Sequence, residues 1–362
     1  MMSCRNPYKL NETRIQREAF LEWFARERDM LKVCVFGGGA IGGYIAGHLA
    51  RSRQCEVSVI SRGKTLEAIR ARGIRVVTAS EDFTVSVNAC SDPRELGVQD
   101  YIFVTLKAHQ IDEALGQITS LMDSHTVVLP PTTGIPYYFF HGSQGALNDR
   151  QMPRIDPEGH QWRALPASQV LGCVYWIGAH SIEPGVIVQD GAKAGCPVGE
   201  LDGTHSKRAG DLSELLSASG IPSRVSDDIR AAIWVKFVNS LCWNPVAVLT
   251  QGSLGEMRDA GDIVPVVKTM MLEADAIALR IGIRVGPDAD KRIEMTLSAA
   301  HHKMSMLQDL EAGRPFELDA LERSLHAVRE LTDVRTPTLD TVLAMARLRA
   351  RTAGRASATH AH

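Results

Sequence analysis

Residues 33–50 read VCVFGGGAIGGYIAGHLA, and this stretch decides the fold. A short apolar run ends in glycines and passes into an Ala- and Ile-rich segment with helical spacing, and a second apolar run, VSVI, follows at 57–60. Strand, helix and strand within about thirty residues form a βαβ unit, in which the two strands are parallel. We therefore predict an α/β fold that begins with a Rossmann-type dinucleotide-binding domain.

The glycine-rich turn fits the GxGxxG pattern of dinucleotide-binding proteins, because it follows a strand and opens a helix. Its residues are Gly37, Gly38, Gly39, Ala40, Ile41 and Gly42. Gly37 permits a tight turn, Gly39 lets the backbone approach a pyrophosphate, and Gly42 lets helix and strand pack closely. The helix N-terminus adds unpaired N–H donors for the anion. The alternative is a glycine-rich turn that binds no ligand.

The end of the second strand indicates which dinucleotide would bind. An NAD-selective site places Asp or Glu here to accept a hydrogen bond from the ribose 2′-hydroxyl, whereas this strand ends Ser61-Arg62. A guanidinium can hold a 2′-phosphate through two hydrogen bonds. Arg62, with Ser61 and Lys64 beside it, therefore favours NADP(H). The alternative is a solvated surface arginine.

The rest of the chain divides by its periodicity. Short apolar runs predict further strands, with a hairpin at Pro184-Gly185, and from residue 206 the apolar residues have helical spacing, including one segment at 288–311. We predict an N-terminal extension at 1–30, which is either helical or the result of a translation start assigned too far upstream. We predict a dinucleotide-binding domain at 31–205, an all-helical domain at 206–350 and a disordered tail at 351–362. The active site is expected in the cleft between the two domains.

The composition favours a protein that acts on small molecules. The 362 residues carry a formal net charge of −2, which gives no general attraction to nucleic acid or anionic membranes. We identify no apolar run of the length that spans a bilayer, about 20 residues. The seven cysteines are scattered and odd in number, which favours a reducing, cytoplasmic compartment over a disulfide scaffold.

Two lysines are candidates for chemistry on a carbonyl group. Lys107 follows the apolar run at 101–105, at the strand edge where α/β folds bind ligands. Lys236 lies among apolar neighbours, where burial lowers the pKa of an amine toward neutrality. Lys236, Ser240 and Asn244 are spaced by four residues and so share one helical face. The alternative for Lys236 is a surface lysine with a buried stem.

Read in order, residues 32–350 resemble the ketopantoate reductase family. The matching segments are VFGGGAIGGYIAGHLA, VSVISRG, VTLKAHQ, TTGIP, DDIRAAIWVKFVNSLCWNP and SMLQDLEAGRPFELD. The resemblance implies NADPH-dependent reduction of a 2-oxo acid to a 2-hydroxy acid, which for the family's usual substrate is ketopantoate to pantoate.

The resemblance also implies a role for individual residues. Lys236 matches the general acid toward the C2 carbonyl oxygen, and Glu317 matches the active-site glutamate that interacts with this lysine and the nascent hydroxyl. Ser305 matches the serine that binds the substrate carboxylate. Lys107 matches a lysine between cofactor and substrate, and Asn244 matches the asparagine of the family's Asn-Pro pair.

Three positions depart from the family's pattern. Thr133, Ser240 and His302 stand where the family usually has asparagine, although Asn239 is adjacent to the second of them. The resemblance implies that these positions surround the substrate and the nicotinamide. A site built to bond a hydroxyl discriminates strongly, so the identity of the 2-oxo acid stays open.

Other patterns have simpler interpretations. His301 and His302 do not predict a metal site, because adjacent residues on a helix point about 100° apart and no carboxylate or thiol stands at ligand spacing. The aromatic run at 137–140 predicts core packing rather than a lid over the nicotinamide. Asp309 and Glu311 are expected on a solvated helix face.

Two other functions remain open at this stage. One is a β-hydroxyacid dehydrogenase, which also has a Lys-xxx-Asn helix but gives no reason for Ser305 and Glu317. The other is a non-catalytic NADPH-binding regulatory protein, which gives no reason to keep both Lys236 and Glu317. The oligomeric state is either monomer or homodimer.

Overall fold

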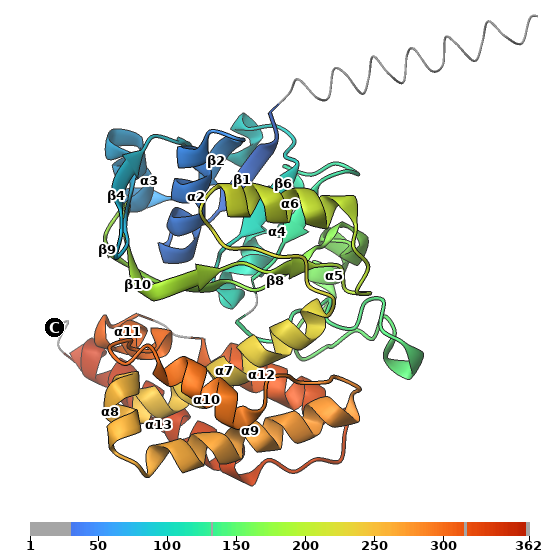
Figure 1. Cartoon of the computed structure of the whole chain (residues 1–362), viewed down its shortest axis with the longest axis vertical. Coiled ribbons are helices and arrows are strands. Elements are labelled where there is room, and N and C mark those ends of the chain that lie inside the picture. Colours follow the sequence, from blue (N-terminus) through green and yellow to red (C-terminus); the bar gives the residue numbers. More distant parts are fainter. Residues whose placement is uncertain (1–29, 132, 315–316, 360–362) are drawn as a thin grey trace, which may run out of the picture.

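The computed structural model describes residues 30–131, 133–314 and 317–359. They form an α/β domain, the upper one in Figure 1, and a helical domain below it. The predicted fold class is confirmed. The predicted N-terminal extension lies outside the described residues, apart from Met30.

The first sheet is the parallel sheet that the glycine motif predicts. Its strand order is β5-β2-β1-β6-β7, and every neighbouring pair is parallel. The central strand β1 is buried from Val33 to Phe36. The strands are β1 (Lys32–Phe36), β2 (Glu56–Ile60), β5 (Asn88–Cys90), β6 (Tyr101–Val104) and β7 (Val127–Leu129). The helices of this domain are α2 (Ala40–Ser52), α3 (Gly63–Arg72), α4 (Ile111–Thr119), α5 (His160–Ala164) and α6 (Lys207–Ala218).

A second sheet packs against helix α2, and its strand β10 runs along the edge of the α/β domain that faces the helical domain (Figure 1). Its order is β4-β3-β10-β9, and the antiparallel β9–β10 pair turns at the predicted Pro184-Gly185 hairpin. The strand before this turn is 176–183. The strands are β3 (Ile74–Val77), β4 (Asp82–Val85), β9 (Trp176–Glu183) and β10 (Val186–Gly195), with β8 (Gly172–Cys173) paired to β11 (Val198–Gly199). Short 3₁₀ turns are η1 (Pro93–Glu95), η2 (Ala108–Gln110), η3 (Gly145–Leu147) and η4 (Ala167–Gln169).

The helical domain is built around its first helix, α7 (Ile229–Thr250). This helix has the length and apolar composition of a membrane span, contrary to our reading of the sequence, but 72% of the relevant window is buried inside the protein. It is therefore a core helix. Around it lie α8 (Leu254–Asp259), α9 (Ile263–Arg280), α10 (Ala289–Leu297), α11 (Ser305–Glu311), α12 (Leu318–Arg329) and α13 (Pro337–Thr359).

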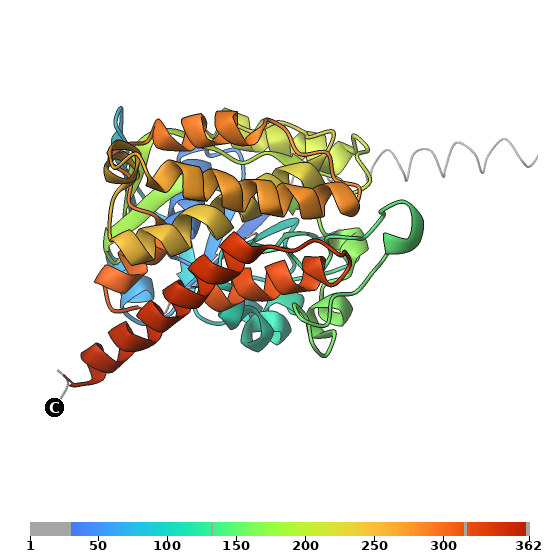
Figure 2. The ribbon, with the colours of Figure 1, turned by 90° about the horizontal axis from the view of Figure 1, so that it is seen from below.

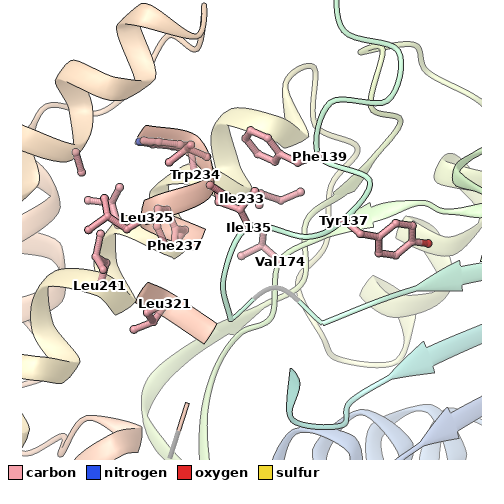
Figure 3. Packing of buried hydrophobic residues seen from close by; sticks show 14 of the residues in the cluster. Ile135, Tyr137, Phe139, Val174, Ile233, Trp234, Phe237, Leu241, Leu321 and Leu325 are labelled. Atoms are coloured by element: carbon pink, nitrogen blue, oxygen red, sulfur yellow. The ribbon is translucent and has the colours of Figure 1, made fainter. Parts of the chain in front are cut away.

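A continuous apolar core joins the two domains. Figure 3 shows the first turns of α7 between α12 and the segment at 135–139. The aromatic run at 137–140 is fully buried, and the Phe139 ring lies 6.4 Å from the Trp234 ring on α7. The prediction that this run packs in the core is confirmed.

The structure corrects three boundaries. Helix α6, which we assigned to the helical domain, packs into the α/β domain through its buried face, whose residues are Ala209, Leu212, Leu215 and Leu216. The predicted helix at 288–311 is two helices, because the carbonyls of Ala300 and His302 accept hydrogen bonds from the N-terminal backbone of α8 instead of continuing the helix. The predicted disordered tail is helical as far as Thr359 and projects beyond the domain in Figure 2. Its sequence lacks proline and contains several alanines, so helix α13 can continue into it despite Gly354.

Candidate active site

The glycine turn has the geometry of a phosphate-binding loop. Gly37 has a positive φ of 122°, and a Cβ at Gly42 would lie 1.9 Å from the Gly37 carbonyl oxygen, so both positions require glycine. A Cβ at Gly39 would meet nothing within 4 Å, which leaves the start of α2 open. No side chain caps α2 and its first turn has no acidic residue. The free N–H donors therefore suit an anionic pyrophosphate.

Arg62 lies beside this loop. A Cβ on Gly38 would lie 2.8 Å from the hydroxyl oxygen of buried Ser61, so the end of β2 packs directly against the glycine turn. Arg62 is exposed at the start of α3, where its guanidinium donates to the Gln117 amide oxygen at 2.8 Å. An exposed cation next to the glycine turn fits a 2′-phosphate.

Lys107 is held across the domain boundary by a residue that our sequence reasoning missed. Its ammonium donates to the Asp309 carboxylate at 2.7 Å, and the Arg314 guanidinium donates to the other carboxylate oxygen at 3.0 Å. Asp309 was expected on a solvated helix face, but its side chain is 12% exposed. The signal was its spacing, because Asp309 lies four residues after Ser305 and so on the same face of α11. We call Lys107, Asp309 and Arg314 the ion triad.

Glu317 contacts the same edge of the α/β domain. Its carboxylate accepts hydrogen bonds from the Ala108 backbone N–H at 2.9 Å and from the Thr133 hydroxyl at 3.3 Å. Glu317 therefore meets the loops that follow β6 and β7. Among the described residues its hydrogen-bond donors are these two rather than Lys236, the partner that the resemblance implied.

Lys236 lies on α7 with its ammonium facing an aromatic ring. It is half-buried, and burial lowers the pKa of its ammonium to about 8. Its Nζ atom lies 4.9 Å from the centroid of the Trp176 ring, at the start of β9. An amine with this pKa can both give and take a proton near neutral pH.

Asn244 organises the predicted carboxylate site. Its amide oxygen accepts hydrogen bonds from the Ser305 hydroxyl at 3.3 Å and from the Met306 backbone N–H at 3.1 Å, while its amide group donates to the Ser240 carbonyl. Asn244 is buried and fixes the first turn of α11, so it acts here through Ser305. The α10–α11 break that our prediction missed is what places Ser305 at this helix N-terminus.

The structure also locates the positions that depart from the family's pattern. Ser240 is buried on the Lys236 and Asn244 face of α7, whereas Asn239 accepts a hydrogen bond from Thr296 on α10 and so does not replace the missing asparagine. His302 faces the β9–β10 hairpin, with its Nδ1 3.6 Å from the Asp190 carboxylate. In residues 30–131, 133–314 and 317–359, no group of three His, Cys, Asp or Glu side chains could hold a metal ion.

A cavity of about 270 Å³ lies beside this region. The loops after β6 and β7 and the helix α12 line it, with Thr133 as the only predicted site residue on its wall. This cavity could not be predicted from local sequence patterns, because its walls come from segments about 200 residues apart.

Comparison with known proteins identifies the family. Residues 33–203 match the family model described as ketopantoate reductase PanE/ApbA, and residues 228–350 match its C-terminal model. The chain is 39% identical over 317 residues to a 2-dehydropantoate 2-reductase of Mesorhizobium japonicum, which covers 88% of this chain and 97% of the relative. A putative ketopantoate reductase from Ralstonia solanacearum superimposes with a TM-score of 0.82 at 32% identity, over 90% of this chain and 99% of that one. Because both domains match in order and the likeness spans nearly the whole of these relatives, the chain belongs to the ketopantoate reductase family.

Proposed function

We propose that the protein is an NADPH-dependent reductase of 2-oxo acids, and that it converts 2-dehydropantoate to pantoate. The observation that carries the proposal is the pairing, on one face of α7, of a half-buried lysine whose ammonium has a pKa of about 8 with an asparagine that holds Ser305. This face can supply a proton and a carboxylate contact to the same small substrate. The Mesorhizobium japonicum relative bears the name of this activity.

The cofactor is proposed from residues of this chain. The open start of α2 would hold the pyrophosphate, and Arg62 would hold the 2′-phosphate that distinguishes NADPH from NADH. When bound, the dinucleotide supplies the hydride that reduces C2. Lys107 and Thr133, in the loops that follow β6 and β7, would border the nicotinamide half.

The protein's own groups would complete the reduction. The Ser305 hydroxyl would hold the substrate carboxylate, which orients the ketone. The Lys236 ammonium would then give its proton to the C2 oxygen as the hydride reaches C2, so that ketone, hydride and proton yield a 2-hydroxy acid. The neutral amine would recover a proton from solvent.

Turnover tests the proposal directly. Purified protein is mixed with NADPH and either 2-dehydropantoate or a panel of alkyl and aryl 2-oxo acids, alongside Lys236→Met, a variant of similar length that cannot donate a proton. We expect NADPH oxidation with 2-dehydropantoate, and a loss of at least about a hundredfold in the variant. Tight NADPH binding without turnover of any 2-oxo acid contradicts the proposal and leaves a non-catalytic NADPH-binding protein.

Three substituted positions favour a second candidate substrate, which is a different 2-oxo acid. Thr133, Ser240 and His302 replace amide side chains with groups of different shape and hydrogen-bonding capacity. If they alter the pocket, the same mechanism acts on another 2-oxo acid. Turnover confined to other members of the panel distinguishes this case.

A reducing, cytoplasmic site of action is part of the proposal. The six cysteines of the described residues are all free and buried, which suits a protein that needs no disulfides. Localising a tagged full-length chain in cells tests it. Its oligomeric state, which we propose to be monomer or homodimer, is a question for light scattering.

A further inference from the structure

The Trp176 ring is the group that faces the Lys236 ammonium. The two residues come from different domains, since Trp176 begins β9 and Lys236 lies in the second turn of α7. Nζ lies 4.9 Å from the ring centroid, within the roughly 6 Å over which an indole face attracts a cation. Burial is the cause of the lowered Lys236 pKa, with no contribution from a charged neighbour in the described part of the chain.

The acidic groups on the neighbouring elements have partners of their own. On the hairpin, Asp190 accepts a hydrogen bond from His180 at 2.8 Å and lies 3.6 Å from His302, which precedes α11. On α11, Asp309 belongs to the ion triad, and at the start of α12, Glu317 bonds the loop after β6. Among the described contacts, the group that faces the Lys236 ammonium is therefore the Trp176 ring rather than a carboxylate.

The backbone fixes the position of the indole. Trp176 pairs with Gly195 on β10, and the β9–β10 register shifts between Gln189 and Ala194. The Trp176 N–H also donates to the Val174 carbonyl at 3.0 Å. Such irregularities re-aim side chains at the ends of strands, and here they present the ring to α7.

We propose that Trp176 is a positioning residue whose indole face holds the Lys236 ammonium at the reacting carbonyl; this inference rests on the proposed function. The indole attracts the ammonium but not the neutral amine. The ring thus stabilises the protonated lysine and no longer attracts the neutral amine once the proton has passed to the substrate oxygen. A carboxylate in its place would hold the ammonium more strongly and make it a weaker acid.

The first test is a titration that needs no turnover. Lys236 reacts with an amine-directed acetylating reagent only when neutral, so competitive labelling across pH, read by peptide mass spectrometry, gives its pKa. Trp176→Leu keeps the site apolar and removes the ring. We expect the Lys236 pKa to fall by about 0.4 to 1.5 pH units, since losing the cation–π attraction destabilises the charged form. Trp176→Phe should give an intermediate value.

The matched control is Trp162→Leu, which removes a half-buried indole that packs against Tyr137 and His141 instead. It should leave the Lys236 pKa unchanged. Thermal melts and NADPH titration establish that each variant is folded. If Trp176→Leu fails to fold, the Lys236 pKa of the wild type is compared with that of Trp176→Phe instead. A Lys236 pKa equal in wild type and in the folded ring variants overturns the inference.

The second test separates this inference from the proposed function. In an active enzyme, the high-pH limb of kcat/KM should move to lower pH in Trp176→Leu by the same amount as the labelling pKa. If the rate falls but the high-pH limb of kcat/KM does not move, Trp176 has only a structural role and the inference is overturned. If the wild type turns over no 2-oxo acid, the proposed function fails, whereas the labelling result still decides whether the indole holds the ammonium.

Discussion

Replacing Asp309 with asparagine should weaken the contact between the two halves of the candidate site while leaving each half folded. The Asp309 carboxylate receives the Lys107 ammonium at 2.7 Å on one oxygen and the Arg314 guanidinium at 3.0 Å on the other. Asparagine keeps the shape and one acceptor but removes the charge. The contact between the β6 edge and the Ser305 helix then weakens.

The solvent exposure of the Lys107, Asp309 and Arg314 side chains determines how much energy is lost when the Asp309 charge is removed. An ion pair at the surface contributes about 0–1 kcal/mol, and breaking a fully buried one costs about 3–5 kcal/mol. Asp309 is 12% exposed, but Lys107 is 34% and Arg314 58% exposed, so water can solvate both cations once the charge is gone. We therefore expect the substitution to weaken the interaction that holds the two halves of the site together by about 1–2 kcal/mol. If this whole loss appears in the transition state, kcat/KM for the 2-oxo acid falls by about 5- to 30-fold. The NADPH dissociation constant should change less, because the glycine turn and Arg62 lie within one domain.

Steady-state kinetics and NADPH titration measure both quantities. The control is Glu311→Gln on the same helix, whose carboxylate pairs with Lys303 and is 46% exposed. It should change kcat/KM by less than about fivefold. A kcat/KM for Asp309→Asn within a factor of about two of the wild type, and no lower than that of the control, would refute the reasoning.

Three further predictions follow from the same geometry. Arg62→Ala should weaken NADPH binding by about tenfold and NADH binding much less, since one exposed charge-assisted contact to the 2′-phosphate is lost. Equal losses of affinity for both dinucleotides in a fluorescence titration would contradict this. Gly42→Ala should abolish dinucleotide binding or lower the melting temperature sharply, because its Cβ would lie 1.9 Å from the Gly37 carbonyl oxygen; NADPH binding at wild-type affinity would show that the turn relaxes. With a Lys236 pKa of about 8, the general acid is protonated below pH 8 and lost above it, so kcat/KM should be flat and then fall about tenfold per pH unit. A profile that stays flat well above pH 8 would assign the acid elsewhere.

Local sequence patterns were enough to predict the first half of the fold. The glycine turn between two apolar runs specified a parallel sheet, and Pro184-Gly185 specified the hairpin. The break between α10 and α11 could not be predicted from periodicity, since the segment at 299–304 is held by α8 rather than by its own sequence. Helix α6 was assigned to the wrong domain for a related reason, because its apolar face is the same whichever core it enters.

The candidate site divides in the same way. The four-residue spacing along α7 predicted that Lys236, Ser240 and Asn244 share a face, and the buried Ser240 and Asn244 beside Lys236 agree with it. The environment of each group was not predictable. Asp309 looked like a solvated residue, and Trp176 carried no signal at all, because their partners lie on the other domain and far away in the sequence.

These missed contacts have one feature in common, which bears on how the site works. Each joins a group of the α/β domain to a group of the helical domain, and the pairs are Lys107–Asp309, Ala108–Glu317, Trp176–Lys236 and Asp190–His302. The residues proposed to bind the dinucleotide lie on one side of this boundary, whereas the proposed proton donor Lys236 and the proposed carboxylate contact Ser305 lie on the other. In the proposed mechanism, hydride and proton reach the same carbonyl from opposite domains, so catalytic geometry would depend on how the domains are held together. Substitutions at the boundary should therefore lower kcat/KM more than they lower the affinity for either substrate taken alone.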